Sequence, residues 1–386
     1  MSKIEELINQ KCPDGVEYKK LGALCEKIKN VVWDEKSRYY IDLSAVSIEL
    51  RSILENGVVQ ITKDSAPSRA KQVVKGSDIL FGGTRPMQGR ICMVPDKYEG
   101  YVASTGFNIV RIKDKAILNK YVYYCMNSRN FYDFIESVQH GASYPAINDS
   151  EMKEYEIPVP PIEVQEEIVR ILDKFTEITA ELKENLTDEL TARQQQYEYY
   201  RDELLTFGDD VDCYELLLGD IFDFQYGKGN NIPNDGGKYP VYGGNGICGW
   251  CSEYNSEDAP VIGHIGAYAG LVKWATGKHF VTYNGVICSH KNVLVNKRFA
   301  YYLLLVQDFL SEQKGAQPFV SYDALKKPIV RVPKSITEQE RIVEILDSFY
   351  AFSNDIIAGL SAEIEARQQQ YEYYRDKLLT FERKVV

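Results

Sequence analysis

An internal repeat constrains the fold of this chain more than any other feature of its sequence. Residues 192–207 read ARQQQYEYYRDELLTF and residues 366–381 read ARQQQYEYYRDKLLTF, so fifteen of sixteen positions match at an offset of 174 residues. The same offset places Gln165 on Gln339, and further matches extend the repeat over about 45 residues. Two copies of one segment predict two copies of one architecture, in the order globule, helix, globule, helix.

Both copies of the repeat have the apolar periodicity of a long helix. Apolar or aromatic residues recur at steps of three and four over residues 168–207 and again over residues 342–381. This spacing is typical of a coiled-coil stripe. Pro161 precedes the first copy and Pro333 precedes the second, and prolines in these places favour a helix that begins just after them. At 1.5 Å per residue, about 45 residues make a helix of roughly 65–70 Å.

The segments between the helices are predicted to be mixed α/β globules, because their apolar runs are short and are bounded by glycines. Strands are expected at residues 78–81, 90–94, 107–111, 239–242 and 259–262. We expect an α+β fold in which two globules are joined by two long antiparallel coiled-coil helices with pseudo-twofold symmetry. The predicted boundaries are 1–160 for the first globule, 161–208 for the first spacer helix, 209–334 for the second globule and 335–386 for the second spacer helix.

The negative charge of the chain is concentrated in the first repeat copy. The formal net charge is −11, and residues 151–207 alone carry 6 basic and 15 acidic residues. Residues 1–150 carry 21 basic and 18 acidic residues, and residues 208–333 carry 11 and 13. The globules are therefore near neutral and lack the strong basic surface of an independent DNA-binding protein, so partner subunits are expected to supply much of any phosphate contact.

Composition excludes several classes of protein. No apolar stretch approaches the roughly 18–20 residues that span a bilayer, and the first residues mix acidic and basic side chains where a signal peptide has a basic start and an apolar core. We therefore expect no membrane contact and a cytoplasmic location. The eight cysteines are scattered, which favours reduced thiols over a disulfide framework.

Two of the cysteines have the spacing of a metal half-site. Cys248 and Cys251 are separated by two residues, and Cys288, His290 and His264 are the residues that would complete four ligands. The competing interpretation is that the pair flanks a glycine turn and that each cysteine acts as a small buried apolar side chain. We favour the second interpretation and predict no metal site.

Several motifs carry a family resemblance. These are the opening CPDGVEYKKLG, the block GSDILFGGT at residues 76–84, the PVPP-x3-Q-xx-I entry into the helix, the two ARQQQYEYYRDxLLTF exits, and YPVYGGNGI followed by VIGHIGAYAG. Together they resemble the specificity subunits of type I restriction–modification systems over essentially the whole chain.

The resemblance implies a non-catalytic subunit whose two target-recognition domains each recognise one half of a split double-stranded DNA sequence. It further implies two copies of a modification subunit, which binds S-adenosylmethionine and methylates adenine, and restriction subunits that hydrolyse ATP and cut. S-adenosylmethionine, ATP and Mg are thus expected on partner subunits, and no cofactor is expected on this chain.

The chain also lacks motifs that catalysis of this kind requires. It has no Asn/Asp-Pro-Pro-Tyr/Phe loop of an adenine methyltransferase and no Walker GxxxxGK[ST] loop. One alternative is a scaffold that uses the coiled coil to dimerise enzymes without contacting DNA. Another is a catalytic methyltransferase, which the missing loop disfavours. Direct binding of a DNA duplex by the assembled complex would argue against the scaffold. Binding of S-adenosylmethionine by the chain alone would argue for the methyltransferase.

Glycine-broken loops with polar side chains are the candidate DNA contacts, because Arg, Lys, Asn, Gln and Thr recognise base edges and phosphates. In the first globule the candidates are Lys63, Arg69, Lys71, Thr84, Arg85, Gln88 and Arg90. In the second globule they are Lys228, Asn230, Asn231, Lys238, Asn245, His264, Tyr268, Thr282 and Asn284. For any single residue, an ordinary solvated turn position is the competing interpretation.

The helix exits contain the candidate partner surface. A polar segment interrupts the apolar stripe at the same place in both copies, and a tyrosine triplet follows it. The polar segment either fixes the register of the helix pair or contacts a partner subunit. Most of the tyrosines are expected to pack, while the exposed member of each triplet is expected to dock a partner. The candidate partner-binding residues are Arg193, Gln195 and Tyr199, with Arg367, Gln369 and Tyr373.

Overall fold

The computed structural model describes residues 3–141, 143–229, 232–310 and 317–384. The chain forms two compact units, of which the first comprises Met1–Asn185 and Ala362–Val386 and the second comprises Leu186–Ser361. Each unit thus contains one globule, the beginning of one long helix and the end of the other. Among the described residues, none of the helices combines the length and the apolar character that crossing a bilayer requires.

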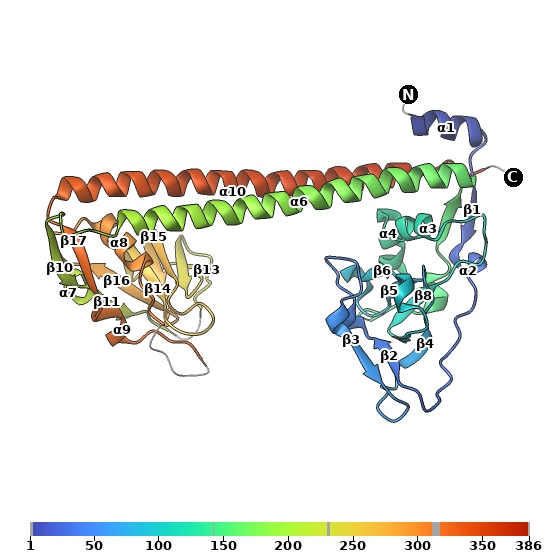
Figure 1. Ribbon diagram of the computed structural model, residues 1–386, viewed down its shortest axis with the longest axis horizontal. Helices are drawn as coiled ribbons and strands as arrows, with labels where there is room; N and C mark the ends of the chain where they lie inside the picture. The colour runs from blue at the N-terminus through green and yellow to red at the C-terminus, as the bar shows by residue number, and fades with distance from the viewer. Residues whose placement is uncertain (1–2, 142, 230–231, 311–316, 385–386) are drawn as a thin grey trace. The chain divides into compact units, whose positions relative to one another are not determined.

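The two predicted long helices are present. Helix α6 extends over Ile162–Leu204 and α10 over Ile336–Leu378, and each has 43 residues (Figure 1). In the first unit Phe175 stacks on Tyr374 with ring centroids 6.0 Å apart. In the second unit Phe349 and Tyr200, which the offset of 174 places on those residues, have centroids 5.8 Å apart. In each unit the beginning of one helix therefore packs antiparallel on the end of the other, as in a coiled coil.

The first globule contains a four-stranded sheet in the order β3-β2-β7-β4, a three-stranded antiparallel sheet in the order β6-β5-β8, and the β1–β9 pair. Its strands are β1 (Glu17–Lys20), β2 (Arg38–Ile41), β3 (Val58–Ile61), β4 (Ala70–Val73), β5 (Ile79–Gly82), β6 (Ile91–Met93), β7 (Val102–Ser104), β8 (Phe107–Val110) and β9 (Glu156–Val159). Its helices are α1 (Lys3–Lys11), α2 (Leu21–Leu24), α3 (Asn119–Cys125), α4 (Arg129–Val138) and α5 (Asp149–Met152), with 3-10 turns η1 (Leu43–Ala45), η2 (Glu55–Gly57), η3 (Pro86–Gln88) and η4 (Asp96–Tyr98).

The second globule contains a six-stranded sheet in the order β11-β16-β14-β15-β12-β13 and the β10–β17 pair. Its strands are β10 (Cys213–Leu217), β11 (Phe222–Tyr226), β12 (Tyr239–Gly243), β13 (Gly246–Cys251), β14 (Ser256–Gly263), β15 (Val272–Val281), β16 (Gly285–His290) and β17 (Ile329–Pro333). Its helices are α7 (Leu218–Ile221), α8 (Lys297–Leu305) and α9 (Tyr322–Lys326). All five strands expected from glycine-bounded apolar runs are present, and the α+β fold class is confirmed.

The core of each unit joins a globule to both long helices. In the first unit, α3 and α4 lie between the helices and strands β5, β6 and β8 (Figure 1). The buried side chains there include Phe131 from α4, Leu172 from α6 and Leu379, which directly follows α10. In the second unit Phe299 of α8 packs with Leu346 of α10. Burial of these apolar side chains stabilises the packing of each globule on the helices. The helix segments that contact a globule therefore have an apolar face.

A buried glutamine anchors each globule at the start of its helix. Gln165 is fully buried, its Oε1 accepts from Leu118 N at 3.0 Å, and its Nε2 donates to the carbonyls of Ala116 and Pro160 at 3.0 and 2.8 Å. Gln339 is equally buried and repeats the arrangement. It accepts from Asn296 N at 2.7 Å and donates to the carbonyls of Leu294 and Pro333 at 3.1 and 2.7 Å. The buried amide thus pairs with three backbone groups in each unit, of which the proline carbonyl is the buried one.

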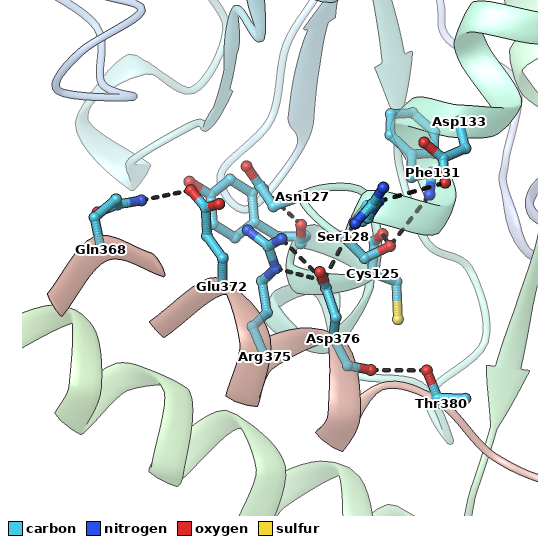
Figure 2. Close-up of polar contacts among 12 residues, drawn as sticks. Cys125, Asn127, Ser128, Phe131, Asp133, Gln368, Glu372, Arg375, Asp376 and Thr380 are labelled. Atoms are coloured by element: carbon cyan, nitrogen blue, oxygen red, sulfur yellow. Dashed lines mark hydrogen bonds and ion pairs between the residues drawn. The ribbon is translucent and has the colours of Figure 1, made fainter. Parts of the chain in front are cut away.

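The exit of α10 is fixed to the first globule by polar contacts as well. Asp376 Oδ1 accepts from the backbone N–H of Arg129 at 3.2 Å, in the first turn of α4 (Figure 2). The buried Arg375 donates through Nε to the same carboxylate at 2.9 Å. Asp202, the equivalent residue of α6, accepts in the same way from Arg201 at 2.7 Å, but this aspartate is exposed and its arginine is only half-buried. The same sequence is therefore used differently in the two units.

Candidate DNA interface and partner surface

A glycine-flexed loop between β5 and β6 presents polar side chains on the first globule. Gly82 N donates to Arg90 O at 2.8 Å and closes the base of the loop. Within the loop, Arg85 has φ +49° and Gly89 has φ +70°, and the turn η3 lies between these two residues. The side chains of Thr84, Arg85 and Gln88 are exposed, so the backbone geometry directs three of the predicted contacts to solvent.

A second segment, which includes His140 and residues 143–147, packs beside this loop. His140 and Ala146 exchange two backbone hydrogen bonds of 2.9 and 2.8 Å. Arg85 N donates to Pro145 O at 2.7 Å and Ile147 N donates to Gly83 O at 2.8 Å. The two segments therefore form one surface, although nearly 60 residues separate them in the sequence.

The turn after β7 brings Arg69 to the same surface. Arg69 O accepts from Thr105 N at 2.8 Å, and the next residue, Gly106, accepts from Gly83 N at 2.8 Å. Lys63 follows β3 and Lys71 lies in β4, and these strands form opposite edges of the four-stranded sheet. Both lysines are exposed, but the structure does not bring them together.

Arg90 requires a correction. Its Nη1 donates to the carbonyl of Leu43 at 2.8 Å and also to the carbonyl of Val46. These contacts fix the chain around η1, so the guanidinium is engaged inside the globule and is left out of the proposed interface. The sequence places Arg90 beside exposed loop residues and does not reveal these carbonyls, which are more than 40 residues away.

In the second globule four loops converge at one end of the six-stranded sheet. Lys228 N donates to Val281 O at 3.0 Å, and His264 N donates to Asn284 O at 2.8 Å. Gly244 lies close to two of these loops, because a Cβ atom added at this glycine would be 3.4 Å from Asn284 O and 3.7 Å from the Cβ of Tyr268. The exposed side chains gathered by these loops are those of Lys228, Asn245, Tyr268 and Asn284.

Two predicted contacts in these loops are buried instead. The ring of His264 stacks on Tyr226 with centroids 4.1 Å apart, and its Nδ1 lies 3.2 Å from Tyr283 O. Thr282 Oγ1 donates to Tyr242 O at 3.3 Å. Both side chains are buried, so they support the loops and are not available to a duplex.

Of the three remaining candidates in this globule, one lies apart from this surface and two lie outside the described residues. Lys238 precedes β12, whereas the convergent loops adjoin the Gly243 end of that strand, and its Nζ lies 4.9 Å from the ring centroid of Tyr239. It is therefore separated from the other predicted residues. Asn230 and Asn231 lie outside the described residues.

The cysteine pair lies in a strand. Cys248 and Cys251 both belong to β13, the first exposed and the second buried. The expectation of a glycine turn with two buried thiols is therefore wrong, because Gly249 continues the strand. Cys288 is buried in the core of the second unit. Within the described part of the chain, no group of three or more His, Cys, Asp or Glu side chains is placed to hold a metal ion.

Sequence reasoning missed some residues on both surfaces. Tyr144 is 70% exposed and its ring centroid lies 4.9 Å from the guanidinium carbon of Arg85. Tyr283 is exposed beside the second set of loops, and Lys273 Nζ donates to Asn245 O at 2.9 Å there. Tyr144 and Lys273 have no distinguishing signal in the sequence, because the residues that they contact come from distant segments. Tyr283 lies between the predicted Thr282 and Asn284 and could have been included.

The predicted partner surface repeats closely on the two helices. Tyr199 is 65% exposed and meets Tyr200 edge-on at 5.4 Å, while Tyr373 is 64% exposed and meets Tyr374 at 5.4 Å. Within the described residues, the other ring contacts of the triplets pack helix on helix. The most exposed member is thus the same tyrosine in both copies, while Tyr200 and Tyr374 are each 39% exposed.

The polar segment before each triplet also repeats its contacts. Arg193 pairs with Glu189 at 3.3 Å and donates to Gln196 Oε1 at 3.2 Å. Arg367 pairs with Glu363 at 2.8 Å and donates to Gln370 Oε1 at 3.1 Å. The side chains of Gln195 and Gln369 are exposed. A surface groove on α6 is lined by Asp188, Glu189, Ala192, Arg193 and Gln196.

Comparison with known proteins identifies the class of this chain. A model of the type I restriction modification DNA specificity domain matches residues 13–192 and 211–366. The match covers more than half of the chain, so the chain belongs to this family, and it is a specificity subunit of a type I restriction–modification system.

Among its relatives is the specificity subunit of the type I restriction enzyme EcoR124I/EcoR124II of Escherichia coli. It is 34% identical over 303 residues, which are 69% of this chain and 72% of that protein. A putative type I restriction enzyme specificity subunit of Haemophilus influenzae is 31% identical over 299 residues, which are 72% of this chain and 76% of that protein.

Solved structures show the same fold. A chain from a study of assembly and conformational transition in a type I restriction–modification system has a TM-score of 0.78, covers 96% of this chain and 98% of its own length, and is 21% identical. The HsdS subunit of Thermoanaerobacter tengcongensis has a TM-score of 0.55 at 21% identity, over 95% of this chain and 97% of its own. At this identity the likeness concerns the fold alone.

Proposed function

We propose that this chain is the non-catalytic DNA-recognition subunit of its complex, and that it recognises a bipartite double-stranded target. Its two globules recognise the two halves, and its helices position the modification and restriction subunits. One observation carries this proposal: the helix exits are nearly identical in the two copies, whereas the loops on the globules differ in the side chains that they expose. Identical surfaces suit two copies of one partner, and different surfaces suit two different half-sites.

The partner side of the proposal rests on the repeated exposure of Tyr199 and Tyr373. Tyrosine is enriched in the buried centres of protein interfaces. These two have nearly the same exposed fraction, and each follows an equivalent Arg–Glu pair along its helix. We assign this surface to two copies of the modification subunit. S-adenosylmethionine is assigned to that subunit, and ATP and Mg to the restriction subunits.

The DNA side of the proposal includes a low intrinsic affinity. The two globules are close to neutral, and the net charge of the chain is −11. Since non-specific affinity grows with the number of phosphates neutralised, the chain alone is expected to bind DNA weakly and to gain affinity in the complex. The exposed loop side chains then contribute mainly to the choice of sequence.

Exchange of one globule tests the proposal. Residues 1–160 are replaced by the matching segment of a relative that carries the same helix exits, because Leu379 completes the core of the first unit. The chimera is expressed with its modification subunit, and the methylated sequences are mapped in the genome. We expect a change in one half of the methylated sequence only. The matched control, exchange of residues 209–334, is expected to change the other half.

Two results would contradict the proposal. If either chimera changed both halves, the globules would not recognise DNA independently. A parallel expression with a catalytically inactive modification subunit tests the non-catalytic part of the proposal, since methylation there would mean that this chain is itself catalytic.

The spacing between the half-sites is assigned to the long helices. Matched insertions of four residues after Leu182 and Leu360 add about 6 Å to each helix and turn it by roughly 40° beyond a full turn, which keeps the apolar stripe nearly in phase. DNA rises about 3.4 Å per base pair. We expect the unspecified gap to grow by one or two base pairs while both half-sites stay unchanged, and an unchanged gap in a folded variant would exclude this role.

A further inference from the structure

Arg85 occupies a backbone conformation that an arginine rarely adopts. Its φ is +49° and its ψ is +57°, in the left-handed region. Side chains with a Cβ atom are disfavoured there, and glycine is the residue that accepts it freely. A residue other than glycine keeps this backbone conformation only when the surrounding structure fixes it, and such residues cluster at functional sites.

The second globule has a glycine at the equivalent position. Arg85 N donates to Pro145 O at 2.7 Å, and Gly266 N donates to Pro318 O at 2.8 Å. The bridge Thr84–Ala146 corresponds to the bridge Ile265–Phe319. Gly266 has φ +86°, and a Cβ atom there would meet nothing within 4 Å. The loop therefore suits glycine in both globules, and the first globule has an arginine in its place.

The side chain of Arg85 is held by an aromatic face. Its guanidinium carbon lies 4.9 Å from the ring centroid of Tyr144, which is 70% exposed. Within the described residues no carboxylate forms an ion pair with Arg85. A cation–π contact uses the face of the guanidinium and leaves the N–H donors in its plane free. Tyr144 thus holds the guanidinium of Arg85 in place and leaves its in-plane N–H groups able to donate hydrogen bonds to a ligand.

We propose that Arg85 recognises a guanine in the half-site of the first globule, and that Tyr144 is the positioning residue that orients its guanidinium. This inference rests on the proposed function. The fork of an arginine matches the O6 and N7 acceptors of guanine in the major groove, and this is the commonest specific contact between proteins and DNA. The second globule lacks this arginine, so its half-site is recognised by other side chains.

The test uses the chain assembled with its modification subunit. Duplexes that carry each of the four base pairs at every target position compete for the complex, and the methylated sequences are mapped in cells. We expect Arg85→Ala to lower the preference for one G·C pair in the first half-site by roughly 5- to 150-fold. The preferences at the other positions of both half-sites are expected to persist.

Three further variants separate recognition from folding. Arg85→Gly suits the backbone, so the melting temperature is expected to hold while the G·C preference is lost. Tyr144→Phe keeps the ring and is expected to keep the preference, whereas Tyr144→Leu is expected to weaken it. Combined with Arg85→Ala, Tyr144→Leu is expected to have no further effect, because a positioning residue acts only through the side chain that it orients.

Several results overturn the inference. An equal loss of binding for all sequences would assign Arg85 to a phosphate, and a changed preference in the second half-site would assign it elsewhere. If Tyr144→Phe and Tyr144→Leu lowered the G·C preference equally, the hydroxyl of Tyr144 and not its ring would be responsible. A wild-type complex without any bipartite preference would refute the proposed function itself, whereas a wild-type preference that Arg85→Ala leaves intact refutes this inference alone.

Discussion

Replacement of Gln165 by leucine is expected to destabilise the first unit selectively. The side chain is fully buried and its amide makes three hydrogen bonds to backbone groups, at 3.0, 3.0 and 2.8 Å. Leucine has nearly the same size but leaves one N–H and two carbonyl groups without these partners. A buried polar group that loses its partner costs about 1–3 kcal/mol. Only the carbonyl of Pro160 is buried, whereas water can reach the exposed Ala116 and the half-buried Leu118. The expected loss is therefore about 2–3 kcal/mol, a large part of the stability of a typical domain.

Hydrogen exchange measures this loss where it occurs. Leu118 directly precedes α3, so the amides of Asn119–Cys125 report opening of the anchored segment. A loss of about 3 kcal/mol corresponds to exchange roughly 150-fold faster. The amides of α8 serve as the internal control, because Gln339 anchors that helix in the second unit. Gln339→Leu is expected to give the reverse pattern.

A loss below about 1 kcal/mol in the first unit would refute this reasoning, because it would mean that the three backbone groups find other partners. Equal acceleration in α3 and α8 would refute it as well, since the two anchors would then not act within their own units.

Three further predictions follow from the repeated helix exits and the buried thiols. Asp376→Ala is expected to destabilise the first unit by about 1–2 kcal/mol, because it removes the acceptor for Arg129 N and the partner of the buried Arg375, whereas Asp202→Ala is expected to cost less than about 0.5 kcal/mol; equal shifts in thermal unfolding would contradict this. Tyr199→Ser and Tyr373→Ser are each expected to leave the fold intact and to weaken binding of the modification subunit by roughly 30-fold, which titration calorimetry measures; unchanged affinity would exclude the tyrosines from that interface. Iodoacetamide at pH 8 is expected to label the exposed Cys248 first, and Cys92 and Cys125 only after unfolding, because burial raises the pKa of both thiols to about 12; rapid labelling of Cys92 in the folded protein would contradict this.

The repeat made the helices predictable, because apolar periodicity and flanking prolines act locally. The docking of the helix exits was not predictable in the same way. Leu379 packs with residues of the first globule that lie more than 200 positions earlier in the chain. Nothing local indicates which globule an exit contacts, since the two exits differ at one position in sixteen.

The candidate interface was predicted in part for a similar reason. Glycines identified the loop that exposes Arg85, because glycines mark turns, and Gly89 has the positive φ angle that glycine adopts freely. The same pattern included Arg90, His264 and Thr282, whose polar atoms contact backbone carbonyls. It missed Tyr144, which meets Arg85 only through pairing of distant segments. Burial and the pairing of distant segments depend on the whole folded chain, so the residues next to a position in the sequence do not reveal them.

The division of the chain also sets the order in which its parts are completed during synthesis. The second unit is one continuous segment, Leu186–Ser361, whereas the first requires Ala362–Val386 in addition to Met1–Asn185. At about 5–20 residues per second, the ribosome needs roughly 10–40 s to extend the chain from the end of the first segment to Leu379. During that time α6 already packs on α3 and α4, but the end of α10, with Leu379, is missing from the core of the first unit. The unit whose synthesis begins first is therefore completed last, and a nascent chain released before Ala362 would contain a complete second unit and an incomplete first one.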